Sequence, residues 1–222
     1  MKAMILAAGR GERMRPLTDH TPKPLLTAAG KPIIEYTIMQ LVAAGFTDIV
    51  INTAHLGEQL PATLGNGERW GANLAYSHEG EQALETAGGI INALPLLGEQ
   101  PFLVVNGDIA TDYDFAKLLN LPVALMHLVL ISNPPHHPQG DFHLAENGQL
   151  SSDKGPKLTF SGIGIYHPDC FRHQPAGIRK LLPVIQQAIH DNKASGENFK
   201  GFWMDIGTPE RLQELHLHYS QP

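Results

Sequence analysis

Short apolar runs alternate along this chain with segments of helical periodicity, and this alternation restricts the possible folds more than any other feature. The predicted strands cover residues 3–7, 48–52, 73–76, 102–105, 123–131 and 159–166. The predicted helices cover the segment between Pro32 and Gly45 and residues 55–64, 86–94, 114–119, 178–190 and 209–218. Strands that alternate with helices form a mostly parallel sheet with crossover helices on its faces. The pattern therefore predicts an α/β fold.

The segment 132–158 is richer in proline, glycine and aspartate than its surroundings and has a more hairpin-like pattern. We expect it to form a small β-rich insertion that covers one side of the sheet. Domains usually contain roughly 100–200 residues. With 222 residues and no low-complexity linker, the chain is expected to form one domain over 1–222, a Rossmann-like, mostly parallel twisted sheet flanked by helices.

Charge and apolar content exclude several classes of partner. The sequence has 16 Lys plus Arg against 22 Asp plus Glu, a formal net charge of −6, so we expect neither a nucleic acid nor a membrane surface as a partner. The apolar stretch 121–131 is far shorter than the roughly 20 residues that span a bilayer. Cys170 is the single cysteine, which excludes an intrachain disulfide and a cysteine-based metal cage. We expect a cytoplasmic protein.

A glycine-rich turn follows the first predicted strand. It contains Gly9 and Gly11 and is followed by several cations, Arg10, Arg13, Arg15 and Lys23. Exposed backbone N–H groups beside flexible cations form a cradle for phosphates, and ligands of open α/β sheets bind at the carboxyl ends of the strands. Met14 stands where a dinucleotide fingerprint requires glycine. The alternative is a plain glycine turn with solvated arginines.

Four motifs in order resemble the signature of the nucleoside-diphosphate-sugar pyrophosphorylases, the sugar-1-phosphate nucleotidyltransferases. They are Gly-x-Gly-x-Arg-Met with Lys-Pro-Leu (9–14 and 23–25), Leu-Glu-Thr-Ala-Gly-Gly (84–89), Asn-Gly-Asp (106–108) and Trp-Met-Asp-Ile-Gly-Thr (203–208). The sequence departs from the family pattern at Glu12, in place of Thr or Ser, and at Glu85, in place of Gly. The family's Glu-Lys-Pro motif is represented only by residues 153–155. The chain has no room for the hexapeptide domain that bifunctional relatives carry at the C-terminus.

The resemblance implies attack by an oxygen of a sugar 1-phosphate on the α-phosphorus of UTP, with release of pyrophosphate. The implied acceptor is N-acetylmuramic acid α-1-phosphate, in peptidoglycan recycling. Alternatives are mannose-1-phosphate guanylyl transfer, glucose-1-phosphate nucleotidyl transfer and a catalytically inactive regulatory subunit of the same fold. A glycosyltransferase would show an Asp-x-Asp motif, which Asp112 and Asp114 match superficially. We expect a monomer or a weak homo-oligomer.

The resemblance also implies roles for individual residues. Arg13 and Lys23 are expected to be catalytic cations on the triphosphate, and Asp108 and Asp205 to bind Mg²⁺. The other expected nucleotide-binding residues are Ala8, Gly9, Gly11, Ala83 and Gly88. The expected sugar-binding residues are Glu79, Asn106, Gly140, Ser161 and Gly162, most of them around the insertion. For the sugar phosphate the sequence leaves Lys154, Lys157 and Lys180 open.

Two further expectations concern side chains near these motifs. Lys23 is expected on an exposed loop, where it buries little surface. His136, His137 and His143 lie near Asp141, but adjacent histidines and a proline-rich loop make a poor rigid cage, which argues against a zinc site.

Overall fold

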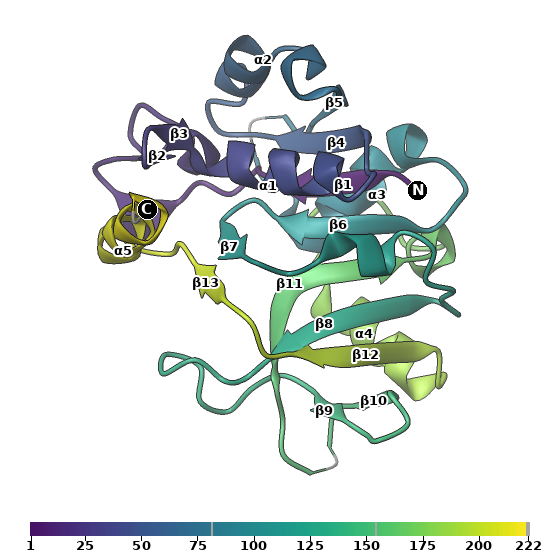
Figure 1. The fold of residues 1–222 in the computed structure, drawn as a ribbon. Helices are drawn as coiled ribbons and strands as arrows, with labels where there is room; N and C mark the ends of the chain where they lie inside the picture. The colour runs from purple at the N-terminus through teal and green to yellow at the C-terminus, as the bar shows by residue number, and fades with distance from the viewer. Residues whose placement is uncertain (81, 154, 221–222) are drawn as a thin grey trace.

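The structure is a computed structural model and describes residues 1–80, 82–153 and 155–220. A seven-stranded sheet with the order β12-β8-β11-β6-β1-β4-β5 forms its centre (Figure 1). β11 is antiparallel to both of its neighbours, and all other neighbouring strands are parallel. The prediction of an α/β fold with a mostly parallel sheet is confirmed. The strands are β1 (Ala3–Leu6), β4 (Asp48–Thr53), β5 (Asn73–His78), β6 (Phe102–Asn106), β8 (Met126–Ile131), β11 (Thr159–Tyr166) and β12 (Ala194–Phe199).

The helices follow the predicted segments with shifted ends. They are α1 (Ile33–Ala43), α2 (Gln59–Leu64), α3 (Glu85–Leu97), α4 (Leu182–His190) and α5 (Pro209–Ser220). The segment 114–119, predicted as a helix, contains only a short 3₁₀ turn, Phe115–Leu118. Asp114 caps this turn by accepting a hydrogen bond from the Ala116 backbone N–H at 3.2 Å, which explains why the local pattern indicated a helix start.

Alternating residues of the central strands enter two different cores. In β1, Ala3 and Ile5 pack with the α1 residues Ile34 and Ile38 in one hydrophobic cluster. Met4 points to the other face, where a second cluster contains the buried side of α3 and α4. Figure 1 accordingly shows α1 on the near face of the sheet. Strands buried on both faces read as continuous apolar runs, which is why the sequence predicted them well.

β12 is the strand of the seven-stranded sheet that the sequence patterns did not predict. It pairs in parallel with β8 over its whole length and forms one edge of the sheet. Its centre is Ser195-Gly196-Glu197-Asn198, which carries no apolar alternation. Its position depends on long-range pairing with β8, because local propensity gives no strand signal here.

The insertion contains a short hairpin of β9 (His143–Leu144) and β10 (Leu150–Ser151). Phe142 and Leu150 are buried in the same cluster as α3 and α4. An isolated bridge joins Gln149 to Ser195 of β12, and Figure 1 shows the hairpin beyond that edge of the sheet. The insertion thus extends the core of the sheet.

Four short strands and the helix α5 surround the C-terminal motif. β7 (Ile109–Thr111) pairs antiparallel with β13 (Trp203–Asp205), and the hydroxyl of Thr111 donates a hydrogen bond to the Phe202 carbonyl at 2.8 Å. β2 (Thr27–Ala28) pairs with β3 (Lys31–Pro32). Leu215 of α5 packs with Ala28 and Met14 in a third cluster. The C-terminal segment therefore lies against the N-terminal part of the chain (Figure 1). Among the described residues, no helix has the length and apolar content to cross a membrane.

Candidate active site

A pocket of about 390 Å³ opens at the carboxyl ends of β1, β4 and β6. This is the edge where open α/β sheets bind their ligands. Three segments meet there: the loop after β1, the loop before α3 and the turn after β6. The lining residues are Leu6, Ala7, Ala8, Gly9, Lys23, Pro24, Asn52, Glu79, Ala83, Glu85, Thr86, Asn106, Gly107 and Asp108.

The loop after β1 has the open backbone that a phosphate site requires. A methyl group built on Gly9 would meet no atom within 4 Å, so a ligand has room to approach the backbone. Gly11 has φ +67°, and a methyl group there would lie 3.0 Å from Thr18 and 3.1 Å from Lys23. The hydroxyl of Thr18 donates a hydrogen bond to the Gly11 carbonyl at 2.8 Å. Gly11 therefore fixes the turn that brings Lys23 to the pocket.

Lys23 is buried, which corrects the expectation of an exposed loop lysine. The residue is 8% exposed, and its Nζ donates a hydrogen bond to Asp108 Oδ2 at 2.6 Å. A 3₁₀ turn, Lys23–Leu25, presents it after Pro22. Its methylene stem packs against the protein while the ammonium group reaches the pocket.

The pairing of β7 with β13 places Asp205 beside the turn after β6. Asp205 is in register with Ile109, and the Ile206 N–H donates a hydrogen bond to the Asp108 carbonyl at 2.7 Å. Asp108 and Asp205, far apart in sequence, therefore occupy adjacent backbone positions, and Asp108 lines the pocket. Both carboxylates remain partly exposed, at 36% and 22% of their side chains.

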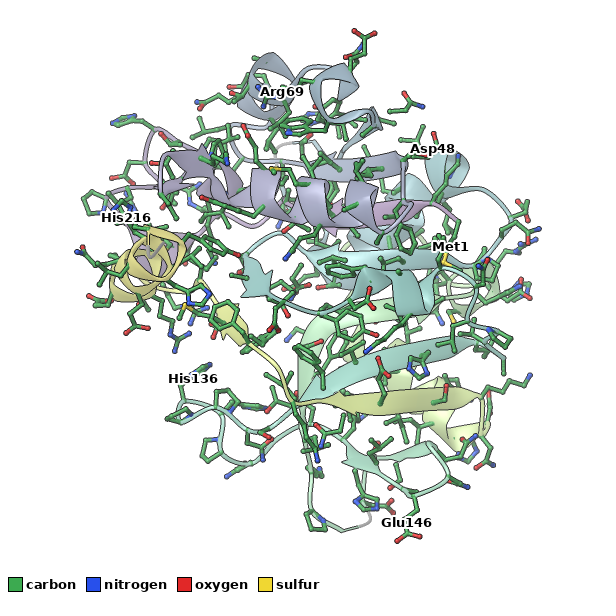
Figure 2. All side chains as sticks on the ribbon, in the orientation of Figure 1. Met1, Asp48, Arg69, His136, Glu146 and His216 are labelled. Carbon is green, nitrogen blue, oxygen red and sulfur yellow. The ribbon has the colours of Figure 1, made fainter. Side chains whose placement is uncertain are left out.

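Two basic side chains contact the Asp205 carboxylate. Its Oδ1 lies 3.2 Å from His136 Nε2, and its Oδ2 pairs with the guanidinium of Arg211. Figure 2 shows His136 on the insertion loop on the side of β13. A methyl group on Gly207 would lie 3.0 Å from Asp205 Oδ2 and 3.1 Å from an Arg13 guanidinium nitrogen. Arg13 therefore lies near Asp205 and Gly207, but it is not among the residues that line the pocket.

The donor set is suited to a hard cation. Mg²⁺ is bound by one or two carboxylates together with phosphate oxygens and water, and Asp108 and Asp205 supply two carboxylates from adjacent backbone positions. Among the described residues, no group of three or more His, Cys, Asp or Glu side chains could hold a metal ion.

The loop before α3 supplies the far wall of the pocket. Ala83, Glu85 and Thr86 line it, and Glu85 has φ +62°, a conformation that a non-glycine residue adopts only under constraint. Gly88 lies one turn further inside α3, is buried, and donates its N–H to the Arg179 carbonyl at 3.2 Å. Its N–H is therefore committed to the protein, and the predicted contact with a base has no support from its position.

The residues predicted to bind a sugar divide into two groups. Asn106 and Glu79 line the pocket, and Gly162 lies against Asn106, where a methyl group would come within 2.4 Å of Asn106 Nδ2. Ser161 is 1% exposed, and its hydroxyl donates a hydrogen bond to the Val129 carbonyl at 2.7 Å. It stabilises the irregular pairing of β11 with β8, because this bond lies at the register shift between them, and its hydroxyl does not face the pocket.

Gly140, Lys157 and Lys180 are not among the residues that line the pocket. Gly140, with φ +62°, packs against Asn133 and the Lys157 backbone. The Lys157 carbonyl accepts a hydrogen bond from Asn133 Nδ2 at 3.0 Å, and Lys180 is exposed. Lys154 lies outside the described residues. The choice among the three lysines stays open.

Replacement of Gly162 by alanine is expected to lower the free energy of unfolding by about 2–4 kcal/mol, because left-handed backbone strain adds to the clash with Asn106. Gly162 has φ +81°. Gly71, with φ +72° and open space around it, is the matched control, and Gly71→Ala is expected to cost about 1 kcal/mol. Urea unfolding of both variants measures the difference. If both variants lost the same free energy of unfolding, the Asn106 side chain would have to move aside without cost.

Sequence patterns did not identify Asn52 and Arg211 as parts of the site. Asn52 lies in β4 near its carboxyl end and lines the pocket, and its position after an apolar run was an available signal. Arg211 lies in the first turn of α5 and contacts Asp205. Only its helical spacing from Asp205 and Gly207 hinted at this contact.

The chain is similar over nearly its whole length to known nucleotidyl transferases. The sequence profile of a family described as nucleotidyl transferase matches residues 2–222. The chain is 54% identical to N-acetylmuramate alpha-1-phosphate uridylyltransferase of Neisseria meningitidis, with 96% of each chain covered. It is 34% identical to the protein of that name from Caulobacter vibrioides, over 94% of this chain and 92% of the relative. Identity to mannose-1-phosphate guanyltransferase of Hypocrea jecorina is 32%, over 95% of this chain and 62% of that longer protein.

Solved structures share the fold at low sequence identity. A Bacillus anthracis structure, described as a glucose-1-phosphate thymidylyltransferase in complex with a sucrose, superposes with a TM-score of 0.85 at 23% identity, covering 100% of this chain and 96% of that one. HddC of Yersinia pseudotuberculosis, complexed with GMP-PN, gives a TM-score of 0.81 at 20% identity, with 99% of each chain covered. At these identities the likeness establishes the fold alone.

Proposed function

The chain belongs to the nucleotidyl transferase family, and we propose that it condenses UTP with N-acetylmuramic acid α-1-phosphate to form the UDP-sugar and pyrophosphate, as a step of peptidoglycan recycling. The observation that carries this proposal is the contact of Lys23 with Asp108 in the pocket lining, together with the pairing of β7 with β13, which places Asp205 next to Asp108 along the backbone. The choice of UTP and of the acceptor is supported by the 54% identical relative of that name.

The reaction needs charge neutralisation more than proton transfer. A bond forms between a phosphate oxygen of the sugar 1-phosphate and the α-phosphorus of UTP. The bond from the α-phosphorus to the oxygen that bridges to the β-phosphate breaks, and pyrophosphate leaves with the electron pair. The attacking oxygen is already anionic, so no general base or covalent intermediate is required. Positioning and electrostatic stabilisation provide the catalysis.

The cations around the pocket meet that need. Lys23 holds its ammonium group at the pocket on a buried stem, where it neutralises charge that develops around the α-phosphate. Arg13 lies on the side of Asp205 and Gly207 and binds the outer phosphates. Asp108 and Asp205 would hold Mg²⁺, which supplies Lewis-acid stabilisation of the phosphoryl oxygens.

The remaining lining divides between the two substrates. Ala8 and Gly9 offer backbone to the nucleotide, and Ala83 borders the space for its base. Asn106 ends β6 beside Asp108, and Gly162 packs against it, so this pair faces the sugar phosphate. Gly11 acts on the nucleotide through the turn that it shares with Lys23.

Pyrophosphate release with a matrix of substrates tests the proposal. UTP and GTP are each combined with N-acetylmuramic acid α-1-phosphate, mannose 1-phosphate and glucose 1-phosphate. The expected result is the highest kcat/KM for UTP with N-acetylmuramic acid α-1-phosphate. A higher value for GTP with mannose 1-phosphate, the activity in the name of the 32% identical relative, would replace the proposal. No pyrophosphate with any pair would favour an inactive regulatory subunit.

We also propose a cytoplasmic location and a monomeric or weakly associating state. The free thiol of Cys170 agrees with a reducing compartment, and size-exclusion chromatography across concentrations measures the association.

A further inference from the structure

A chain of three hydrogen bonds connects the loop after β1 with the loop before α3. The Ala7 N–H donates to Asn52 Oδ1 at 2.7 Å, Asn52 Nδ2 donates to Glu79 Oε1 at 2.6 Å, and the Leu84 N–H donates to Glu79 Oε2 at 2.7 Å. We propose that Asn52 and Glu79 are positioning residues that hold these two loops at a fixed separation across the nucleotide pocket. This inference rests on the proposed function and replaces the sugar contact expected for Glu79.

We call these three hydrogen bonds, from Ala7 through Asn52 and Glu79 to Leu84, the relay. At both ends of the relay, the direction of hydrogen-bond donation is fixed. Ala7 and Leu84 contribute backbone N–H groups, which only donate, so the side chains between them must present acceptors at each end. Asn52 accepts at one end and donates at the other, and the Glu79 carboxylate accepts twice. Asn52 is 3% exposed, so a bond lost at this amide would leave a buried polar group unpaired.

Close packing holds the relay in place. A methyl group on Gly89 would lie 2.4 Å from Glu79 Oε1 and 2.9 Å from Asn52 Nδ2, so α3 passes directly over the contact between the two side chains. The third bond ends at Leu84, which directly precedes the left-handed Glu85 in the pocket wall. The relay therefore restrains the residue next to a constrained position of the lining.

Both ends of the relay adjoin the proposed nucleotide site. Ala7 directly precedes Ala8 and Gly9, and Leu84 lies between Ala83 and Glu85. A shift at either end changes the distance between the phosphate side and the base side of the pocket. Misplacement of about 1 Å lowers rates strongly when catalysis depends on positioning.

Exchanging the two side-chain chemistries tests the relay. In Asn52→Asp, the new carboxylate faces the Glu79 carboxylate, and neither can donate a hydrogen bond. In Glu79→Gln, the new amide N–H group faces another donor, either Asn52 Nδ2 or the Leu84 N–H. Each single variant therefore loses one hydrogen bond. The double variant Asn52→Asp/Glu79→Gln restores all three hydrogen bonds. The new carboxylate at position 52 accepts from the Ala7 N–H and from the amide N–H at position 79. The amide oxygen at position 79 accepts from the Leu84 N–H. The net charge of the pair is unchanged.

The matched control is the exposed pair Asn66 and Glu68, which makes the same kind of contact, Asn66 Nδ2 to Glu68 Oε1 at 2.9 Å, outside the pocket lining. The single and double exchanges there are expected to leave kinetics unchanged. At 52 and 79, each single exchange is expected to lower kcat/KM for UTP about 10- to 100-fold with little change in KM for the sugar phosphate. The double exchange is expected to recover to within about threefold of wild type.

Amide hydrogen exchange of the unliganded protein gives a readout independent of activity. Protection of the Ala7 and Leu84 amides is expected to fall in the single variants and to return in the double variant, while the unfolding temperature shows that all variants fold. A double variant that regains protection but not activity would overturn the positioning role and show that the Glu79 charge contacts substrate. Unchanged protection in the single variants would overturn the relay itself. Wild-type protein that shows the relay but neither binds nor turns over UTP would overturn the proposed function instead.

Discussion

Replacement of Asp205 by asparagine is expected to lower turnover by roughly two to four orders of magnitude, because the amide keeps the shape of the side chain but removes a negative metal ligand. Metal affinity is expected to fall as well. Two measurements check this: kcat as a function of Mg²⁺ concentration, and direct binding of Mn²⁺ to the unliganded protein. The control is Asp112→Asn, which changes an exposed carboxylate next to β7. This variant is expected to keep the wild-type kcat and the wild-type metal affinity.

Asp205 lies on a strand and does not cap α5. Asp205 ends β13, and the Thr208 hydroxyl accepts the hydrogen bond from the Arg211 N–H, at 3.4 Å. The partly exposed pairs of Asp205 with His136 and Arg211 contribute little to folding, so stability is expected to change by less than about 1 kcal/mol. Activity within threefold of wild type with an unchanged Mg²⁺ dependence would leave Asp108 as the only proposed ligand.

Replacement of Lys23 by alanine is expected to lower kcat by about 10²–10³-fold, the range for loss of one preorganised charge in an active site. The burial of Lys23 adds a cost in stability, because alanine also removes a packed methylene stem. We expect a loss of about 1–3 kcal/mol in the free energy of unfolding. Single-turnover kinetics and urea unfolding measure the two effects separately.

Lys23→Met separates charge from packing. Methionine retains an unbranched apolar stem of similar length, so stability is expected to stay closer to wild type while the rate loss persists. Recovery of activity in Lys23→Met would mean that the stem, and not the ammonium group, supports the reaction. Near-normal activity in both variants would exclude the role of Lys23 on the triphosphate.

Local sequence signals predicted the buried strands. β11 covers 159–166 as predicted, and β1 ends one residue earlier than predicted, at Leu6, because fully buried strands carry continuous apolar runs. β12 was missed because its polar centre is specified by pairing with β8. Propensity acts over a few residues, whereas register with a distant strand is a property of the assembled sheet.

The candidate site was predictable by residue type and less so by geometry. Asp108 and Asp205 were identified from motifs, but only the pairing of β7 with β13 makes them neighbours. The burial of Lys23 depends on the turn at Gly11 and on neighbouring segments of the same chain. No local sequence pattern describes these contacts. The contacts predicted for Ser161 and Gly88 stay predictions, and local patterns did not indicate that the Ser161 hydroxyl bonds to Val129 and the Gly88 N–H to Arg179.

The antiparallel contact between β7 and β13 has a consequence for biosynthesis. The proposed phosphate loop lies within residues 1–25 and is made well before Asp205 and Arg211. The sheet from β1 to β6 contains its own core and has the contacts to collapse while the ribosome is still extending the chain. Asp205 reaches its position beside Ile109 only when the segment that contains β13 pairs with β7. A nascent chain therefore displays the proposed phosphate loop before β13 and α5 have been made.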